Sequence, residues 1–312
     1  MFTIAPEKPD YISPAFARRS RRSRLGLGTS GAPVSERLFG ELHRIHQLGP
    51  VPAMRMQRGG DVVPHWGTNA GGYTLEALLR IRPNGRPLPD FEEWEVKAHK
   101  VRNFSRPGNA LVTLFSAAPT GGFYHDAGPE AFIRRFGYAA RGGYPGQLNI
   151  YSDHVVGKRN KKTKLALRLV RAWDCLVLEL EDGAPAAIWD FGKLAEHWNH
   201  KHAFAVYVPY IGGGRYEQTF QYGPNVLVGE GTDFDRFLDM LEAGRISHDP
   251  GLSLVGAEGC RTRVRRRVQF RIRVGDLPSL YRRFKWVDVR DAPVAADGAQ
   301  LIWAGIPRRR AI

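Results

Sequence analysis

The stretch GGYTLEALLRIRPNGRPLPDFEEWEVKAHKV, residues 71–101, carries the signals that decide the fold. A glycine-rich turn leads into a helix with Thr74 as its expected N-cap, because a hydroxyl oxygen can accept from a free amide of the first turn. The cluster PNGRPLPD at residues 83–90 predicts a turn. The segment EEWEVKAHKV at residues 92–101 then alternates polar and apolar residues, which is typical of a strand.

Three charged residues of this stretch, Asp90, Glu95 and Lys97, form the pattern P-D-x4-E-x-K. Residues two apart on a strand share a face, so Glu95 and Lys97 would project together while Val96 points into the core. Two carboxylates supply the oxygen ligands of a hard divalent cation, and such a cation activates water for phosphodiester hydrolysis. A nearby ammonium can orient that water and offset developing charge. The alternative is a solvated strand face with a weak Glu–Lys ion pair.

The charge balance is strongly basic, because 46 Lys and Arg residues against 31 Asp and Glu residues give a net charge of +15. This excess favours a polyanionic partner such as nucleic acid or an anionic membrane surface, although a basic composition can also reflect the genome. No apolar run approaches the ~20 residues that span a bilayer, and the N-terminus lacks the order of a signal peptide. The two cysteines, Cys175 and Cys260, have no metal-type spacing. We therefore expect a reduced, cytoplasmic protein without a membrane segment.

The whole chain predicts one α/β domain with a mixed β-sheet core and flanking helices. We expect residues 1–34 to form a basic, flexible arm, residues 35–290 the domain, and residues 291–312 a C-terminal tail. The expected helices lie at residues 35–48, 129–138, 194–202 and 232–244, and the expected strands at residues 110–119, 147–152, 175–181, 186–191 and 203–210.

Residues 261–274 alternate between arginine and apolar side chains, so as one strand they would present a row of guanidinium groups on one face. The planar guanidinium fork suits phosphates and guanine edges, and like charges on one face repel one another without an anion. The row therefore predicts DNA contacts, and the alternative is a charged face that protects a sheet edge. The DNA-binding candidates of the row are Arg263, Arg265, Arg267, Arg271 and Arg273.

Two smaller clusters have an ordinary structural alternative. Tyr124 and His125 lie in a glycine-rich segment after a predicted core strand, where a loop can either contact bases or be an ordinary surface loop. His197, His200 and His202 crowd one end of a predicted helix, but their spacing does not place all three on one face. We therefore expect an exposed helix end there and no zinc site.

The stretch between Gly71 and Lys97 resembles the catalytic segment of the MvaI/BcnI restriction endonucleases. These belong to the PD-(D/E)XK nuclease superfamily and are related to the mismatch-repair nicking enzyme MutH. The family order is a G-x-T-L-E helix start, a helix, an asparagine-containing turn, P-D and then E-x-K. Residues 112–119 are similar to the family's T-L-F strand, and residues 241–250 and 268–281 resemble its later segments more loosely. The matching residues are Gly72, Thr74, Leu75, Glu76, Asn84, Pro89, Asp90, Glu95, Val96 and Lys97.

This resemblance implies a restriction-endonuclease-like fold with a DNA-binding cleft, and a Mg²⁺-dependent endonuclease that acts on double-stranded DNA. Asp90 and Glu95 would be the metal ligands, Lys97 would lie at the attacking water, and Glu76 would be a supporting acid on the helix. MutH-like enzymes carry a second lysine on a later helix, for which Lys201 is the positional candidate.

The resemblance also suggests a catalytic part at about residues 50–210 and a DNA-reading part at about residues 211–285. A sequence-specific type II restriction enzyme is the first interpretation, with a cognate DNA methyltransferase encoded nearby as a partner. A MutH-like nicking enzyme and a DNA-binding protein that keeps the fold without cutting remain as alternatives. The triplet Arg267-Val268-Gln269 replaces the family's His-Gly before A-F-R-I, which leaves the target sequence open. An RNA-binding protein would need aromatic-rich motifs that this chain lacks.

Overall fold

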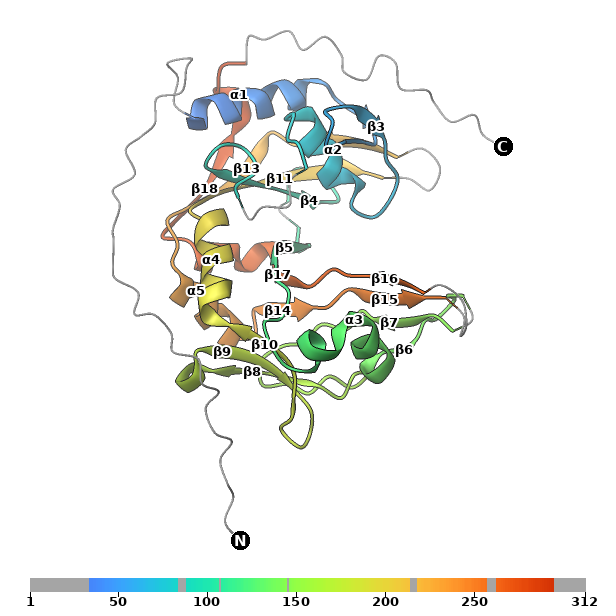
Figure 1. Cartoon of the computed structure of the whole chain (residues 1–312). Helices are drawn as coiled ribbons and strands as arrows, with labels where there is room; N and C mark the ends of the chain where they lie inside the picture. Colours follow the sequence, from blue (N-terminus) through green and yellow to red (C-terminus); the bar gives the residue numbers. More distant parts are fainter. Residues whose placement is uncertain are drawn as a thin grey trace.

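The computed structural model describes residues 34–83, 88–106, 108–144, 146–213, 218–256 and 262–294. These residues form a mixed α/β structure, which is the class that the sequence predicts (Figure 1). Their apolar side chains pack into two hydrophobic cores. The basic run at residues 18–24, Asn84 and Cys260 lie outside the described residues. Within the described part of the chain, no helix is long and apolar enough to cross a membrane.

The main sheet holds the predicted catalytic strand, β4 (Trp94–Lys100), at one edge. Its central strand is β11 (Phe204–Gly212), which pairs in parallel with β4 on one side and in antiparallel with β13 (Asn225–Glu230) on the other. The remaining strands of this sheet are β1 (Val51–Pro52), β12 (Thr219–Tyr222) and β18 (Arg283–Asp288).

Two helices, α1 (Val34–Gln47) and α2 (Ala70–Leu78), pack on the main sheet and form the first core with it. Helix α2 begins at Ala70, so the prediction of Thr74 as its N-cap is wrong. Thr74 is instead buried inside the helix, where its hydroxyl donates to the carbonyl of Met54 at 3.2 Å and accepts from the Met54 amide at 3.0 Å. Gly71 faces the ring of Tyr210, and a Cβ there would lie only 2.5 Å from it. The helix therefore needs glycine to approach the sheet this closely.

The second core is built from three smaller sheets and three helices. The sheets contain β10 (Pro185–Asp190), β9 (Cys175–Glu179) and β8 (Ala166–Val170); β14 (Ile246–Asp249), β17 (Gln269–Arg273) and β5 (Leu111–Ser116); and β16 (Arg263–Arg265), β15 (Leu252–Val255), β7 (Leu148–Ile150) and β6 (Tyr138–Ala139). The helices are α3 (Phe123–Phe136), α4 (Phe191–Lys201) and α5 (Phe234–Glu242). The outlying hairpin β2 (Met54–Met56) with β3 (Val62–Pro64), and the 3-10 helices η1 (Arg171–Trp173), η2 (Val274–Leu280) and η3 (Val289–Asp291), complete the described elements.

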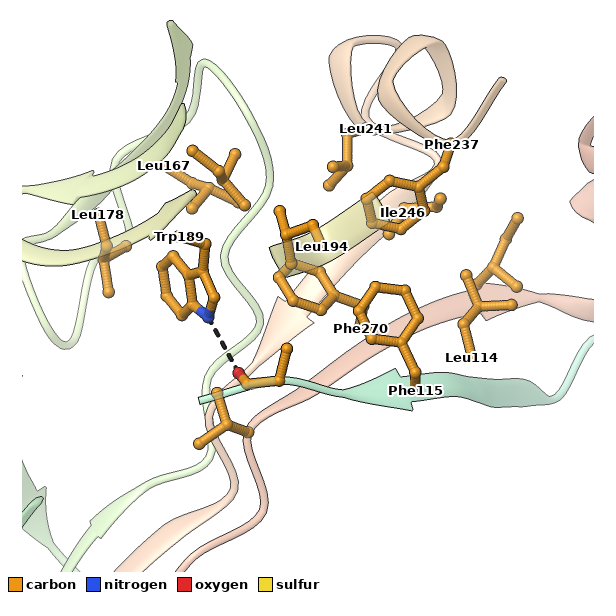
Figure 2. Close-up of a cluster of buried hydrophobic side chains, with 14 of the residues drawn as sticks. Leu114, Phe115, Leu167, Leu178, Trp189, Leu194, Phe237, Leu241, Ile246 and Phe270 are labelled. Carbon is orange, nitrogen blue, oxygen red and sulfur yellow. Dashed lines mark hydrogen bonds between the residues drawn. The ribbon is translucent and has the colours of Figure 1, made fainter. Parts of the chain in front are cut away.

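Aromatic rings fill the second core (Figure 2). The ring of Phe115 lies 5.2 Å from that of Phe270 and 5.3 Å from that of Phe237, so β5, β17 and α5 meet at one point. The indole nitrogen of Trp189 donates to the carbonyl oxygen of Ala117 at 2.9 Å, which satisfies the only polar group of a fully buried side chain.

Strand β11 lies between the two cores and contributes alternate residues to each. Ala205 and Tyr207 belong to the second core, whereas Val206 and Val208 belong to the first, as the two-residue period of a strand requires. Residues from both sides of position 210 contribute to both cores. The two cores therefore do not coincide with the predicted catalytic part before position 210 and the predicted DNA-reading part after it. That functional division stays a prediction.

Candidate active site

Strand β4 places Glu95 and Lys97 on the sheet face that looks toward the second core. In the parallel register, Glu95 lies beside Ala205 and Lys97 beside Tyr207, and both partners belong to that core. Val96 between them packs into the first core, as predicted. Glu95 is completely buried, so the alternative of a solvated Glu–Lys face is wrong.

Two lysines from different elements hold the Glu95 carboxylate. The ammonium of Lys97 donates to its Oε1 atom, and the ammonium of Lys201 donates to Oε1 at 3.1 Å and to Oε2 at 3.3 Å. Lys201 is the last residue of α4, so its position near the site depends on the fold and not on sequence proximity. A lysine from a later helix thus reaches the carboxylate of the E-x-K pattern, and its role as the second lysine of the site stays a prediction.

Asp90 lies just before β4 and returns to it through a tight turn. Its Oδ2 atom accepts from the amide of Val96 at 3.3 Å, and Phe91 pairs with Trp94 across the turn. Glu92 adopts a left-handed conformation with a φ of 53°, which lets the chain reverse within so few residues. The turn therefore carries Asp90 back to the edge where Glu95 and Lys97 lie.

Helix α2 adds Glu76 to this group of charges. Burial, followed by the nearby Asp90, raises the pKa of Glu76 to about 7. The pKa of Asp90 is also raised, chiefly by burial, with Glu95 adding to the shift and Lys97 opposing it. Burial alone would lower the pKa of Lys97, but the carboxylates of Glu95 and Asp90 outweigh it and raise that pKa. Lys97 is therefore a stable cation, better suited to hold a water or a phosphate than to remove a proton.

The donor set fits a hard divalent cation. Among the described residues, no group of three His, Cys, Asp or Glu side chains already surrounds a common point. Mg²⁺ needs fewer protein ligands than that, because it commonly binds one or two carboxylates and fills its remaining positions with water and phosphate. Burial raises the pKa of Glu76 most, and repulsion from Asp90 and Glu95 adds to the shift; a bound cation would relieve that repulsion.

A buried hydrogen-bond chain lies behind the site and connects four elements. The Nε2 atom of His202 donates to the carbonyl of Leu114 at 3.1 Å, which leaves Nδ1 to accept from the Tyr281 hydroxyl at 3.1 Å. The Tyr281 oxygen can then accept from the hydroxyl of Tyr207 at 2.7 Å. Burial and the nearby Lys97 hold the pKa of His202 well below its usual value, so the ring is neutral.

The expectation that the histidine cluster forms an exposed helix end is therefore wrong for His202, which is completely buried. His200 is exposed, and His197 stacks on Phe115 with ring centroids 5.9 Å apart.

The predicted arginine strand is wrong as one element. Residues 263–265 form β16, which pairs with β15, whereas residues 269–273 form β17, which pairs with β14 and β5 in another sheet. Arg271 forms an ion pair of 2.9 Å with Asp249, and Arg273 donates to the carbonyl of Asn109 at 3.3 Å. The exposed arginines of the row for which the described residues provide no ion pair are Arg263, Arg265, Arg267 and Arg273.

The placement of Tyr124 and His125 in a loop is also wrong, because both lie in the first turn of α3. The helix starts six residues before the expected one and contains a kink at Gly128, whose φ is 82°. Tyr124 is buried with its ring centroid 5.2 Å from that of Phe132, so this ring has no free face for a base. His125 is exposed, and its DNA contact stays a prediction.

The model of the MvaI/BcnI restriction endonuclease family matches residues 39–281. The solved complex of restriction endonuclease MvaI with its cognate DNA substrate is 16% identical with a TM-score of 0.63, and the match covers 80% of this chain and 96% of that one. The structure of MvaI without DNA is 12% identical with a TM-score of 0.45, covering 82% and 98%. Curated protein sequences give no match.

The structural likeness to the MvaI complex shows a shared fold, and the family match covers most of the chain. That match includes Glu76, Asp90, Glu95, Lys97 and Lys201, the residues that meet at the buried edge of the main sheet. The chain belongs to the MvaI/BcnI restriction endonuclease family.

Proposed function

We propose that this chain is a Mg²⁺-dependent endonuclease that hydrolyses phosphodiester bonds at a specific sequence of double-stranded DNA, as a type II restriction enzyme. The observation that carries the proposal is the convergence of Asp90, Glu95 and Lys97 with Glu76 and Lys201 at one buried site. The related MvaI structure was solved with its cognate DNA substrate, which supports duplex DNA as the substrate. A methyltransferase that protects the same sequence would be the natural partner of such an enzyme.

Asp90 and Glu95 would hold the cation, which supplies Lewis-acid polarisation of the scissile phosphate when bound. The Val96 amide donates to Asp90, which fixes one carboxylate relative to the strand. Lys97 carries a permanent positive charge beside Glu95 and lies partly exposed, so its ammonium can also donate to an attacking water or a phosphate oxygen. Glu76 takes up a proton near pH 7, which lets the site adjust its negative charge.

A nicking enzyme of the MutH type is the second candidate. Lys201 favours it, because this residue reaches Glu95 from α4 as the second lysine of MutH-like enzymes would. The convergence of the charged residues argues against a DNA-binding protein that does not cut, since burying several charges without a use for them is costly.

The deciding experiment is incubation of the purified protein with a supercoiled plasmid of known sequence, with Mg²⁺ or with a chelator. Discrete linear fragments that need Mg²⁺ would support a restriction enzyme. Nicked circles would instead support the MutH-like alternative. Intact plasmid whose mobility is retarded by bound protein would contradict both and identify a DNA-binding protein without activity.

A further inference from the structure

A lysine-rich turn, defined as residues 158–164 with the sequence KRNKKTK, connects β7 with β8. Five of its seven residues are basic, and the side chains of all five are exposed. Neither the catalytic site nor the arginine row includes this turn. The basic residues of the turn are Lys158, Arg159, Lys161, Lys162 and Lys164.

Hydrogen bonds fix the shape of the turn from within. The side-chain oxygen of Asn160 accepts from the amides of Lys162 at 2.9 Å and Thr163 at 3.1 Å. The side-chain nitrogen of Asn160 donates to the carbonyl of Asp153 at 3.0 Å, and Thr163 is anchored on the buried His154 at 2.8 Å. The backbone is therefore already ordered, and a ligand that binds here pays little for ordering it.

Four of the five basic residues of the turn line a hollow, and Asp153 is the one acidic residue of that lining. The hollow has a volume of about 330 Å³ and is lined by Ser152, Asp153, Val155 and residues 158–162. No basic side chain of the turn forms an ion pair with a carboxylate in the described parts of the chain, and Lys162 instead lies over the ring of Tyr138 at 4.7 Å. The hollow has more room than one phosphate group needs, and its lining suits a polyanion with repeating phosphates.

Two arginines of β17 lie near Asp153, which lines the hollow. Burial, together with the nearby Asp249, raises the pKa of Asp153, and the guanidinium groups of Arg271 and Arg273 are close enough to oppose that shift. Arg273 in turn contacts the carbonyl of Asn109, which lies in the segment between β4 and β5. The hollow therefore has two arginines of β17 close to it, in addition to the cations of the turn.

We propose that the lysine-rich turn binds the phosphate backbone of duplex DNA outside the target sequence. The proposal rests on the proposed function, since it assumes that duplex DNA is the substrate. Backbone contacts of this kind fix the position and orientation of the protein without selecting a sequence. Their contribution to affinity comes from released counterions and therefore depends on salt.

The test compares two double variants with the wild type. K161A/K162A removes two cations of the turn, and R283A/K285A removes two cations of β18 that are already paired with Glu230, as a control of equal charge. Binding is measured against salt with random-sequence duplexes of about 12 and about 40 base pairs. Removing one lysine–phosphate interaction flattens the log–log salt dependence by about 0.9. We expect a slope change of up to about 1.8 for K161A/K162A with the longer duplex only, and none for the control.

Equal slopes for wild type and K161A/K162A would overturn the proposal, as would an equal change in both double variants, which would report net charge alone. An effect of the same size with the short duplex would overturn the placement outside the target. Wild-type protein that binds neither duplex would instead contradict the proposed function. The unfolding temperature of each variant shows whether it is folded, and substitution of exposed lysines is expected to leave it unchanged.

Discussion

The catalytic edge of the main sheet and the second core differ in the kind of polar group that they bury. At the catalytic edge, Glu95 is fully buried and stays paired with two lysine ammonium groups. In the second core, His154 and His248 are buried with their ring centroids 6.0 Å apart, and burial lowers the pKa of both. A neutral ring costs less to bury than a charged group, which needs a partner of opposite charge. Among the residues that the structure describes, the fully buried carboxylate of Glu95 thus lies at the proposed catalytic edge.

The largest expected effect is the loss of cleavage when a carboxylate of the catalytic edge is neutralised. Asp90→Asn and Glu95→Gln each remove a cation ligand of nearly unchanged shape, so we expect a rate loss of at least ~10² to 10³ with DNA binding largely intact. Plasmid cleavage and a gel-shift assay measure the two properties. Cleavage by either variant at near the wild-type rate would remove these residues from the assignment.

Lys97 tests whether position or charge alone matters at this edge. Lys97→Ala should bind DNA without cutting it, and Lys97→Arg should lose about 10² in rate, because a planar guanidinium cannot replace a compact ammonium at the same place. Lys193, an exposed lysine at the start of α4, provides a matched control in Lys193→Arg. A Lys97→Ala enzyme that cuts well would show that the ion pair with Glu95 is only structural.

Substitutions in the arginine row should have smaller effects, and the structure predicts a different kind of effect for its two parts. Alanine substitution of Arg263, Arg265 or Arg267 should flatten the log–log salt dependence of DNA binding by about 0.9 for each arginine that binds a phosphate. Arg271→Ala should instead lower the unfolding temperature, because it leaves Asp249 without its partner. Unchanged salt dependence in the first three variants would identify a solvated edge.

The pH dependence of stability gives the most direct contrast between the two regions. The pKa of Glu76 rises from its ordinary 4.5 to about 7 on folding, so the folded state binds more protons and the unfolding free energy falls as pH rises between these values. The pKa of His154 falls from 6.5 to about 4, so its contribution is lost as pH falls through that range.

Denaturant unfolding with a chelator present, at several pH values, measures both trends. Glu76→Gln should remove the decline above pH 4.5, and His154→Gln should reduce the acid destabilisation below pH 6.5. A Glu76→Gln protein with an unchanged pH profile would show that Glu76 is not held in a buried environment.

The predictions from sequence were most accurate for strand β4, where the alternation of residues and the pattern of charged residues indicate the same strand. The two-residue period around Glu95 and Lys97 and the position of Val96 were enough to orient that strand. The prediction of a single arginine strand was wrong, because alternation alone cannot show that residues 263–265 and 269–273 pair in different sheets. Thr74 has the residue type of a cap, but the helix begins earlier, at Ala70, where Gly71 packs on Tyr210.

His202 and its tyrosine partners could not have been found from spacing. Their hydrogen bonds join residues 79 and 88 positions apart, and these depend on the way α4, η2 and β5 pack together. Lys201 was only a positional candidate for the same reason, since its ion pair with Glu95 is a property of tertiary structure. The resemblance to a family supplied that expectation, and the residues themselves did not.

The parallel pairing of β4 with β11 also determines when the site can exist during synthesis. Glu95 contacts Lys201, which lies 106 positions later in the chain, and β11 follows α4 directly. A chain still on the ribosome therefore carries Asp90, Glu95 and Lys97 long before it has the helix and the central strand that hold them together. Because long-range contacts form only after both segments have been made, the newborn enzyme gains its DNA-cutting geometry late in translation. Nascent fragments that end before α4 would have the catalytic residues and no assembled site.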